Sequence, residues 1–132
     1  MSEIAKTALQ ASTYNNIHIT NSSVGVVNTG NLARIDAAIT MSKGTQSEEF
    51  GARLKDLTDA ILSSTEVDDK RKQELVEVVQ AVSDQAIGEK KPSKPVISAL
   101  FDKLKDLSAG VVVIADGVEK LHEAWTNLSG LF

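Results

Sequence analysis

No cysteine occurs in the chain, and it has only two prolines and 4% aromatic residues. The absence of cysteine excludes disulfides, thiolate metal sites and a cysteine nucleophile, and it predicts a reducing compartment, the cytoplasm. The chain also lacks an excess of basic residues, because its 14 Lys and Arg are outnumbered by 18 Asp and Glu. Phosphate backbones are bound by clustered Lys and Arg, so we expect no nucleic-acid partner.

Long apolar runs are absent as well. The longest purely apolar run, 111–115, is far shorter than the about 20 residues that span a bilayer. The first ten residues have neither the basic start nor the apolar centre of a secretory signal, so we expect no secretion by that route. Action on a membrane by an amphipathic C-terminal helix is the last of three functional interpretations, because the polar face of that helix mixes Asp, Glu and Lys.

A short β pattern follows an N-terminal stretch, 1–16, which has no sustained period and predicts a flexible arm. Apolar and polar residues alternate over 17–20, and an apolar strand pattern resumes at 24–27 after turn residues. The sequence therefore predicts a β element over 17–31. Because two strands of about four residues are marginal alone, we expect them to pack on the helices or to pair between copies of the chain.

From residue 32 onward the apolar spacing becomes helical. It predicts a short helix over 32–41, a second over 47–63 with Ser47 as its cap, and a third that starts near Asp68 and ends before Gly88, its C-cap. The second and third helices are joined by a short connection, which predicts an antiparallel hairpin with apolar stripes that need cover.

Ten apolar residues near the C-terminus fall on an unbroken 3-4-3-4 spacing, the heptad pattern of coiled coils. They predict one long helix from Pro95 to Leu128, roughly 50 Å in length at about 1.5 Å per residue. Such a helix extends beyond the hairpin and leaves part of its apolar seam uncovered, which predicts an interface. The seam consists of Ile97, Leu100, Leu104, Leu107, Val111, Ile114, Val118, Leu121, Trp125 and Leu128.

We therefore predict a homo-oligomer held together by the β element and the long helix. An alternative is that the first helix and the β segment fold back over the seam. Gly110 and Gly117 either permit close helix approach or bend the long helix onto its own domain. The predicted interface residues are Ile17, Ile19, Val24, Val26, Val111, Ile114, Val118, Leu121, Trp125 and Leu128.

Few residues in the sequence predict chemistry. His18 and His122 have no third ligand or carboxylate at a spacing typical of a metal site or a triad, so we interpret both as structural. Glycines 25 and 30 have phosphate-loop spacing, but the Lys and Ser or Thr that must follow are absent. We predict no catalytic residue, no metal ligand and no cofactor. The second functional interpretation is a small ligand at a subunit interface, bound by Asn28, Thr29 and Asn31.

One segment resembles the start of a group of small uncharacterised bacterial proteins and appended modules with the pattern I-x-I-x-x-S-x-V-G-x-x-N-T-G. The segment is Ile17-His18-Ile19-Thr20-Asn21-Ser22-Ser23-Val24-Gly25-Val26-Val27-Asn28-Thr29-Gly30. With the helices that follow, the resemblance covers roughly half of the chain. It implies a bacterial source and a β-then-α order, and no activity, ligand or catalytic residue.

These patterns predict a mainly α-helical fold in one domain, 1–132, with an arm at 1–16, a short β element at 17–31 and a helical bundle at 32–132. Within the bundle we expect a helical hairpin and a long C-terminal heptad helix. We predict a non-enzymatic structural or scaffolding protein that assembles with copies of itself.

Overall fold

The chain is helical over most of the part that the computed structural model describes, residues 16–17, 29–87 and 92–130. Its helices there are α2 (Thr29–Ser42), α3 (Glu48–Ser63), α4 (Asp69–Ile87), α5 (Lys94–Leu107) and α6 (Val112–Ser129). The mainly α-helical fold class is confirmed. Most of the predicted β element lies outside the described residues, and its last part is helical, because α2 begins at Thr29. None of these helices is long and apolar enough to cross a membrane.

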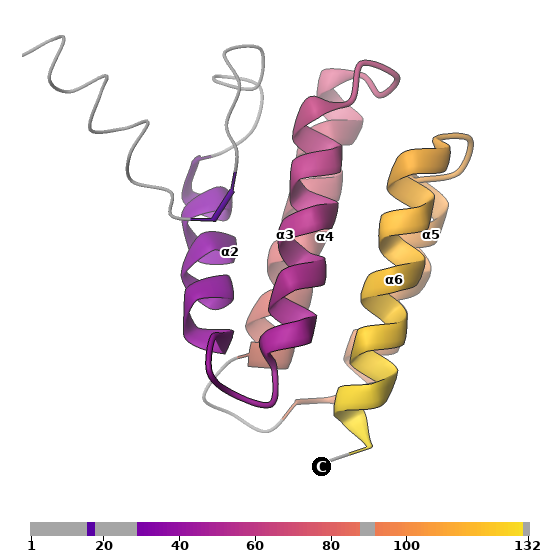
Figure 1. The fold of residues 1–132 in the computed structure, drawn as a ribbon. Helices are drawn as coiled ribbons and strands as arrows, with labels where there is room; N and C mark the ends of the chain where they lie inside the picture. The colour runs from indigo at the N-terminus through magenta and orange to yellow at the C-terminus, as the bar shows by residue number, and fades with distance from the viewer. Residues whose placement is uncertain (1–15, 18–28, 88–91, 131–132) are drawn as a thin grey trace, which may run out of the picture.

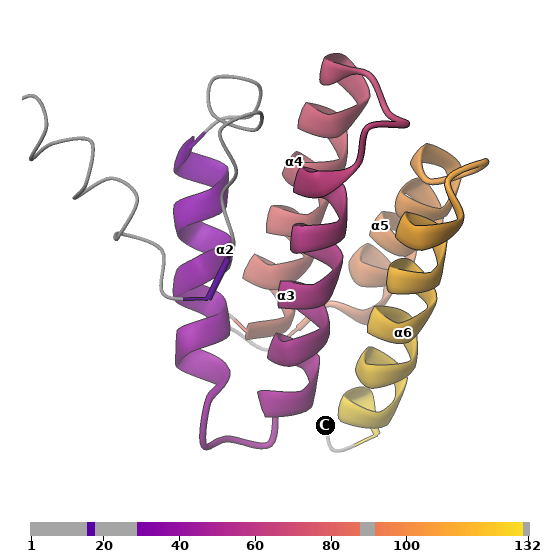
Figure 2. The same ribbon diagram turned by 45° about the horizontal axis from the view of Figure 1, so that its top comes forward.

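Consecutive helices run in opposite directions and form a bundle (Figure 1, Figure 2). α3, α4, α5 and α6 make a ring in which each helix packs against the next and α6 closes on α3. In Figure 1, α3 and α6 form the front layer, and α4 and α5 lie behind them. α2 lies beside this ring and packs against α3 and α4. Antiparallel neighbours with short connections are the usual architecture of helical bundles.

The second predicted helix shows how apolar spacing produces this bundle. Phe50, Leu54, Leu57 and Ile61 repeat at intervals of three or four residues, and all four are buried on one face of α3. Two glutamates occupy the first turn, where the positive end of the helix dipole favours negative charge. This helix and its buried stripe are therefore confirmed.

A buried lysine joins α3 to α4 at their connection. Asp68 directly precedes α4, which was predicted to start near this residue, and its carboxylate accepts the backbone N–H of Arg71 at 2.8 Å. One turn later, the buried Lys72 ammonium donates to the carbonyls of Leu62 (3.3 Å) and Ser64 (3.1 Å). The last carbonyls of a helix lack helical partners, and a cation is favoured there. Lys72 thus closes the C-terminal end of α3.

The predicted long C-terminal helix is wrong, because the chain reverses direction between α5 and α6. Gly110 has φ = +87°, in the left-handed region that favours glycine. Hydrogen bonds of the turn support the reversal: the Ser108 N–H donates to the Leu104 carbonyl at 2.9 Å, and the Val111 N–H donates to the Ser108 carbonyl at 3.0 Å. The bend at Gly110 that the sequence offered as an alternative is a complete reversal (Figure 1).

The two halves of the apolar seam lie on α5 and α6. Both halves face the same core, so the 3-4 spacing of the sequence is compatible with the reversal. The distal residues Val118, Leu121 and Leu128 are buried within the chain. The ring of Trp125 meets that of Phe50 edge to face, with centroids 6.2 Å apart. α3 therefore covers the part of the seam that was predicted to be open, and the reason for an interface along it does not hold.

Gly117 has a different role from Gly110. A Cβ atom at Gly117 would lie 3.1 Å from Leu57 Cδ1 and 3.5 Å from Leu57 Cα. The absence of a side chain thus lets α6 approach α3 closely, as one of the two sequence interpretations predicted.

The described N-terminal residues are fixed on α2. Ile17 is buried in the core, and Asn16 is hydrogen bonded to Asp36. Asn16, the last residue of the predicted flexible arm, is thus held by the Asp36 carboxylate. The rest of the arm, 1–15, lies outside the described residues.

Candidate functional site

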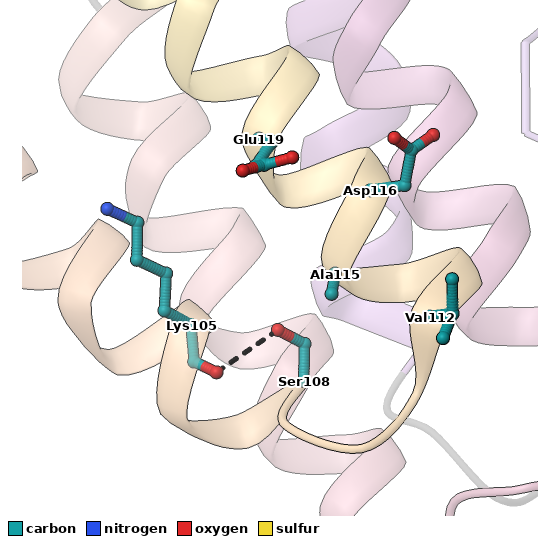
Figure 3. Close-up of a pocket in the computed structure, with 6 residues that line it drawn as sticks. All are labelled: Lys105, Ser108, Val112, Ala115, Asp116 and Glu119. Carbon is teal, nitrogen blue, oxygen red and sulfur yellow. Dashed lines mark hydrogen bonds between the residues drawn. The ribbon is translucent and has the colours of Figure 1, made fainter.

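The described surface is hollowed between α5 and α6, near the turn that joins them (Figure 3). This space, called the α5–α6 hollow below, has a volume of about 540 Å³ and is open to solvent. Small-ligand sites range over about 300–1,000 Å³, so the hollow is large enough for a small molecule. Its lining residues are Lys105, Ser108, Val112, Ala115, Asp116 and Glu119.

Two small residues lie in the hollow, where larger side chains would fill the space. Ser108 is buried, and its hydroxyl donates to the Lys105 carbonyl at 3.2 Å, shown as a dashed line in Figure 3. Ala115 follows in the first turns of α6 and contributes only a methyl group. Because neither side chain reaches far from its backbone, the two helices leave a gap between them.

Opposite charges stand at the hollow on its two helices. Lys105 belongs to α5 and Glu119 to α6, and Figure 3 shows their side chains on either side of the gap. Within the described ranges, neither charged group has a hydrogen-bond or ion-pair partner. Asp116 differs, because its carboxylate lies 3.2 Å from the Lys120 ammonium. The hollow therefore offers an ammonium and a carboxylate that the fold does not use.

Val112, which lines the hollow, and Val113, which does not, lie at the start of α6 and are called the valine pair below. Their exposed fractions are 79% and 65%. Two other large hydrophobic side chains are exposed in the described chain, Met41 (57%) near the end of α2 and Val96 (44%) near the start of α5. Only the valine pair, among the described residues, puts two consecutive side chains of this kind in water.

The predicted interface residues do not gather on a described surface. Ile17 is buried, and its N–H donates to Asp36 Oδ1 at 3.3 Å. The predicted residues Ile19, Val24 and Val26 lie outside the described residues. Those of the C-terminal seam are buried in the core of their own chain, namely Val111, Ile114, Val118, Leu121, Trp125 and Leu128.

The predicted ligand residues are not brought to the hollow. Asn28 lies outside the described residues, and Thr29 begins α2. Asn31 belongs to a contact between α2 and α4, where its side chain donates to Gln80 Oε1 and accepts from Gln73 Nε2 at 3.2 Å. The Asn31 amide therefore has a structural use in joining the two helices.

The described histidine, His122, is partly buried against Phe101. The two rings are tilted, with centroids 4.8 Å apart, and they join α6 to α5. His18 lies outside the described residues. In the described ranges, no group of three His, Cys, Asp or Glu side chains is placed to hold a metal ion.

The buried polar side chains take part in hydrogen bonds that hold the fold. The hydroxyls of Ser42, Thr58, Ser83 and Ser108 each donate to a carbonyl three or four residues earlier. Lys72 closes α3, and Asp36 holds Asn16 and Ile17. No buried side-chain nitrogen or oxygen of the described residues lacks a hydrogen-bond partner. These groups are therefore accounted for by structure.

One titratable group on the surface of α3 has a shifted pKa. Lys55 donates to the Asp59 carboxylate at 2.8 Å, and this hydrogen bond raises the pKa of Lys55. The two residues are four apart, a spacing that supports an exposed helix. The pair lies outside the lining of the hollow.

Sequence reasoning missed the lining of the hollow. Lys105 and Glu119 are 14 residues apart, and on one straight helix about 1.5 Å per residue would separate them widely along the axis. The available signal was Ser108-Ala109-Gly110, in which a small polar residue and a glycine interrupt the seam. Reading this triplet as a turn would have placed the two charged residues on neighbouring helices.

Comparisons with protein families, with curated proteins and with solved structures found no match. The candidate functions below therefore rest on the residues of this chain.

Proposed function

We propose that the protein is a non-catalytic structural protein that acts by assembling with copies of itself. The observation that carries this proposal is the exposure of the valine pair at the turn between α5 and α6. Burying apolar surface is favourable by about 25 cal/mol per Å². A contact that covers both valines is therefore favoured.

A second copy of the chain suits this surface for reasons of symmetry and charge. A two-fold contact places identical patches together, so the valine pair of one copy meets that of the other. Charges of both signs lie near it, because Lys105 of α5 and Asp116 of α6 line the same hollow as Val112. Mixed charges allow two copies to meet without strong repulsion.

The hydrogen bonding of the buried polar groups supports a structural role. Hydroxyls, carboxylates and ammonium groups are side chains that enzymes use as nucleophiles, acids and bases. In this chain the Asp36 carboxylate and the Lys72 ammonium join separate segments. Their donors and acceptors are engaged in the fold.

The β-patterned segment remains part of the proposal on sequence grounds. Its ends are fixed at Ile17, in the core, and at Thr29, where α2 begins. We propose that the residues between these two ends supply a second contact between copies, because two short strands are marginal alone. In this proposal the chain works in the cytoplasm and its partner is itself.

The test is the molar mass of the full chain by size-exclusion chromatography with light scattering, over the low to high micromolar range. We expect an oligomer that Val112→Ser with Val113→Ser shifts toward the monomer. Val96→Ser is the matched control, because it removes an exposed valine from the start of α5. A monomeric natural chain at high micromolar concentration would overturn the proposal, as would equal effects of the two sets of substitutions.

A further inference from the structure

The α5–α6 hollow combines three kinds of surface that one class of small molecule matches. Lys105 supplies a positive charge, Glu119 a negative charge, and Val112 with Ala115 an apolar wall. We propose that the hollow binds a small zwitterion with an apolar side chain, a free aliphatic α-amino acid. The lining residues all belong to one chain, so the site is complete without a second copy, and it shares Val112 with the contact proposed above.

The two unpaired charges select a ligand that carries both signs. A ligand carboxylate pairs with the Lys105 ammonium, and a ligand ammonium pairs with the Glu119 carboxylate; both are charge-assisted hydrogen bonds. Asp116 would make the hollow acidic, but Lys120 lies 3.2 Å from its carboxylate and balances it. The charges left for a ligand are therefore one positive and one negative.

The small and apolar residues set the shape of the ligand. The Ser108 hydroxyl donates to the Lys105 carbonyl, so its hydrogen is already used. Ala115 and Val112 then offer methyl groups to a ligand side chain. A branched aliphatic group such as that of leucine covers both. Because the hollow is open and exposed ion pairs contribute little, we expect affinity in the millimolar range.

The first experiment is a titration of the ¹⁵N-labelled full chain with L-leucine, followed by NMR. We expect saturable shifts of the backbone amide signals of Lys105, Ala115 and Glu119. Isoamylamine, which lacks the carboxylate, and 4-methylpentanoate, which lacks the ammonium, should bind more weakly by up to about fivefold, the largest factor that the loss of one exposed ion pair usually produces. Absence of saturable shifts at tens of millimolar leucine, or equal binding of all three compounds, would overturn the proposal.

Variants test the residues themselves. Lys105→Gln and Glu119→Gln should each weaken leucine binding by up to about fivefold, whereas Lys103→Gln and Glu123→Gln, on exposed residues outside the lining, should not. Exchange of the two charges, Lys105→Glu with Glu119→Lys, should preserve binding, because the ligand then binds in the reverse direction. Loss of binding in the exchanged variant, or full binding in Lys105→Gln with Glu119→Gln, contradicts the proposed pairing.

The same titration separates this site from assembly. Val113 is not part of the lining, so Val113→Ser should leave leucine binding unchanged even where it reduces the oligomer. A Val113→Ser chain that no longer binds leucine would show that the hollow is not a complete site in one chain.

Discussion

The Asp36 carboxylate on α2 holds Asn16, which lies 20 residues earlier in the chain. Asp36 Oδ1 accepts the Asn16 backbone N–H at 2.8 Å and the Asn16 side-chain N–H at 3.2 Å. The same oxygen accepts the Ile17 N–H at 3.3 Å, and Asp36 is only 5% exposed. One buried carboxylate therefore places Ile17 in the core.

Asp36→Ala should lower the free energy of unfolding by about 1–3 kcal/mol, because it leaves buried N–H groups without their acceptor. Asp36→Asn should cost less, since its carbonyl oxygen can still accept. Urea unfolding measures the loss, and hydrogen exchange at Ile17 locates it. Asp102→Ala, on the exposed face of α5, is the control. Equal stability of the Asp36 and Asp102 variants would show that this contact does not hold the segment.

Gly110→Ala distinguishes a turn from a continuous helix, because the two structures predict changes of opposite sign in the free energy of unfolding. A left-handed conformation costs a residue with a side chain about 1–2 kcal/mol, and Gly110 has φ = +87°. In a continuous helix the same substitution would stabilise the folded chain by about 1 kcal/mol. A Cβ at Gly110 meets nothing within 4 Å, so steric clash does not confuse the result. Thermal unfolding followed by circular dichroism should show a lower midpoint temperature for Gly110→Ala than for the natural chain. A higher midpoint temperature would instead support one continuous helix.

Truncation of Trp125 or Leu121 should destabilise the folded chain, because both side chains are buried in its own core. Trp125→Ala should cost about 3–5 kcal/mol and Leu121→Ala about 2–5 kcal/mol. Urea unfolding and circular dichroism measure this loss, while light scattering records molar mass. A variant that stays as helical and as stable as the natural chain, but becomes smaller, would place these residues at an interface instead.

Lys72→Met should destabilise the connection between α3 and α4. The carbonyls of Leu62 and Ser64 would lose the Lys72 ammonium as a donor, and a polar group left unsatisfied costs about 1–3 kcal/mol. Lys70→Met is the control, because Lys70 is exposed in the first turn of α4. Chemical unfolding of the two variants gives the comparison. If both variants lose the same free energy of unfolding, the hydrogen bonds of Lys72 do not stabilise the connection between α3 and α4.

The candidate site shows why chemistry was harder to predict than helices. Asn31 was predicted as a ligand residue together with Asn28 and Thr29, yet its amide contacts Gln73 and Gln80, which are more than 40 residues away. Lys105 and Glu119 attracted no prediction, because each is an ordinary surface residue until two helices are placed side by side. Such pairings depend on distant segments, which local spacing does not reveal.

The sequence by itself determined which residues are apolar and on which helical face they lie. The stripe of α3 and the 3-4 spacing from Ile97 to Leu128 are local properties, and their residues are buried or packed against the core. Tertiary structure decided the direction of the chain. Heptad spacing is the same for one long helix and for two helices that turn toward a shared core, so it does not distinguish them. The left-handed backbone at Gly110 and the cover that α3 gives Trp125 select the hairpin, because folding back buries the seam within one chain.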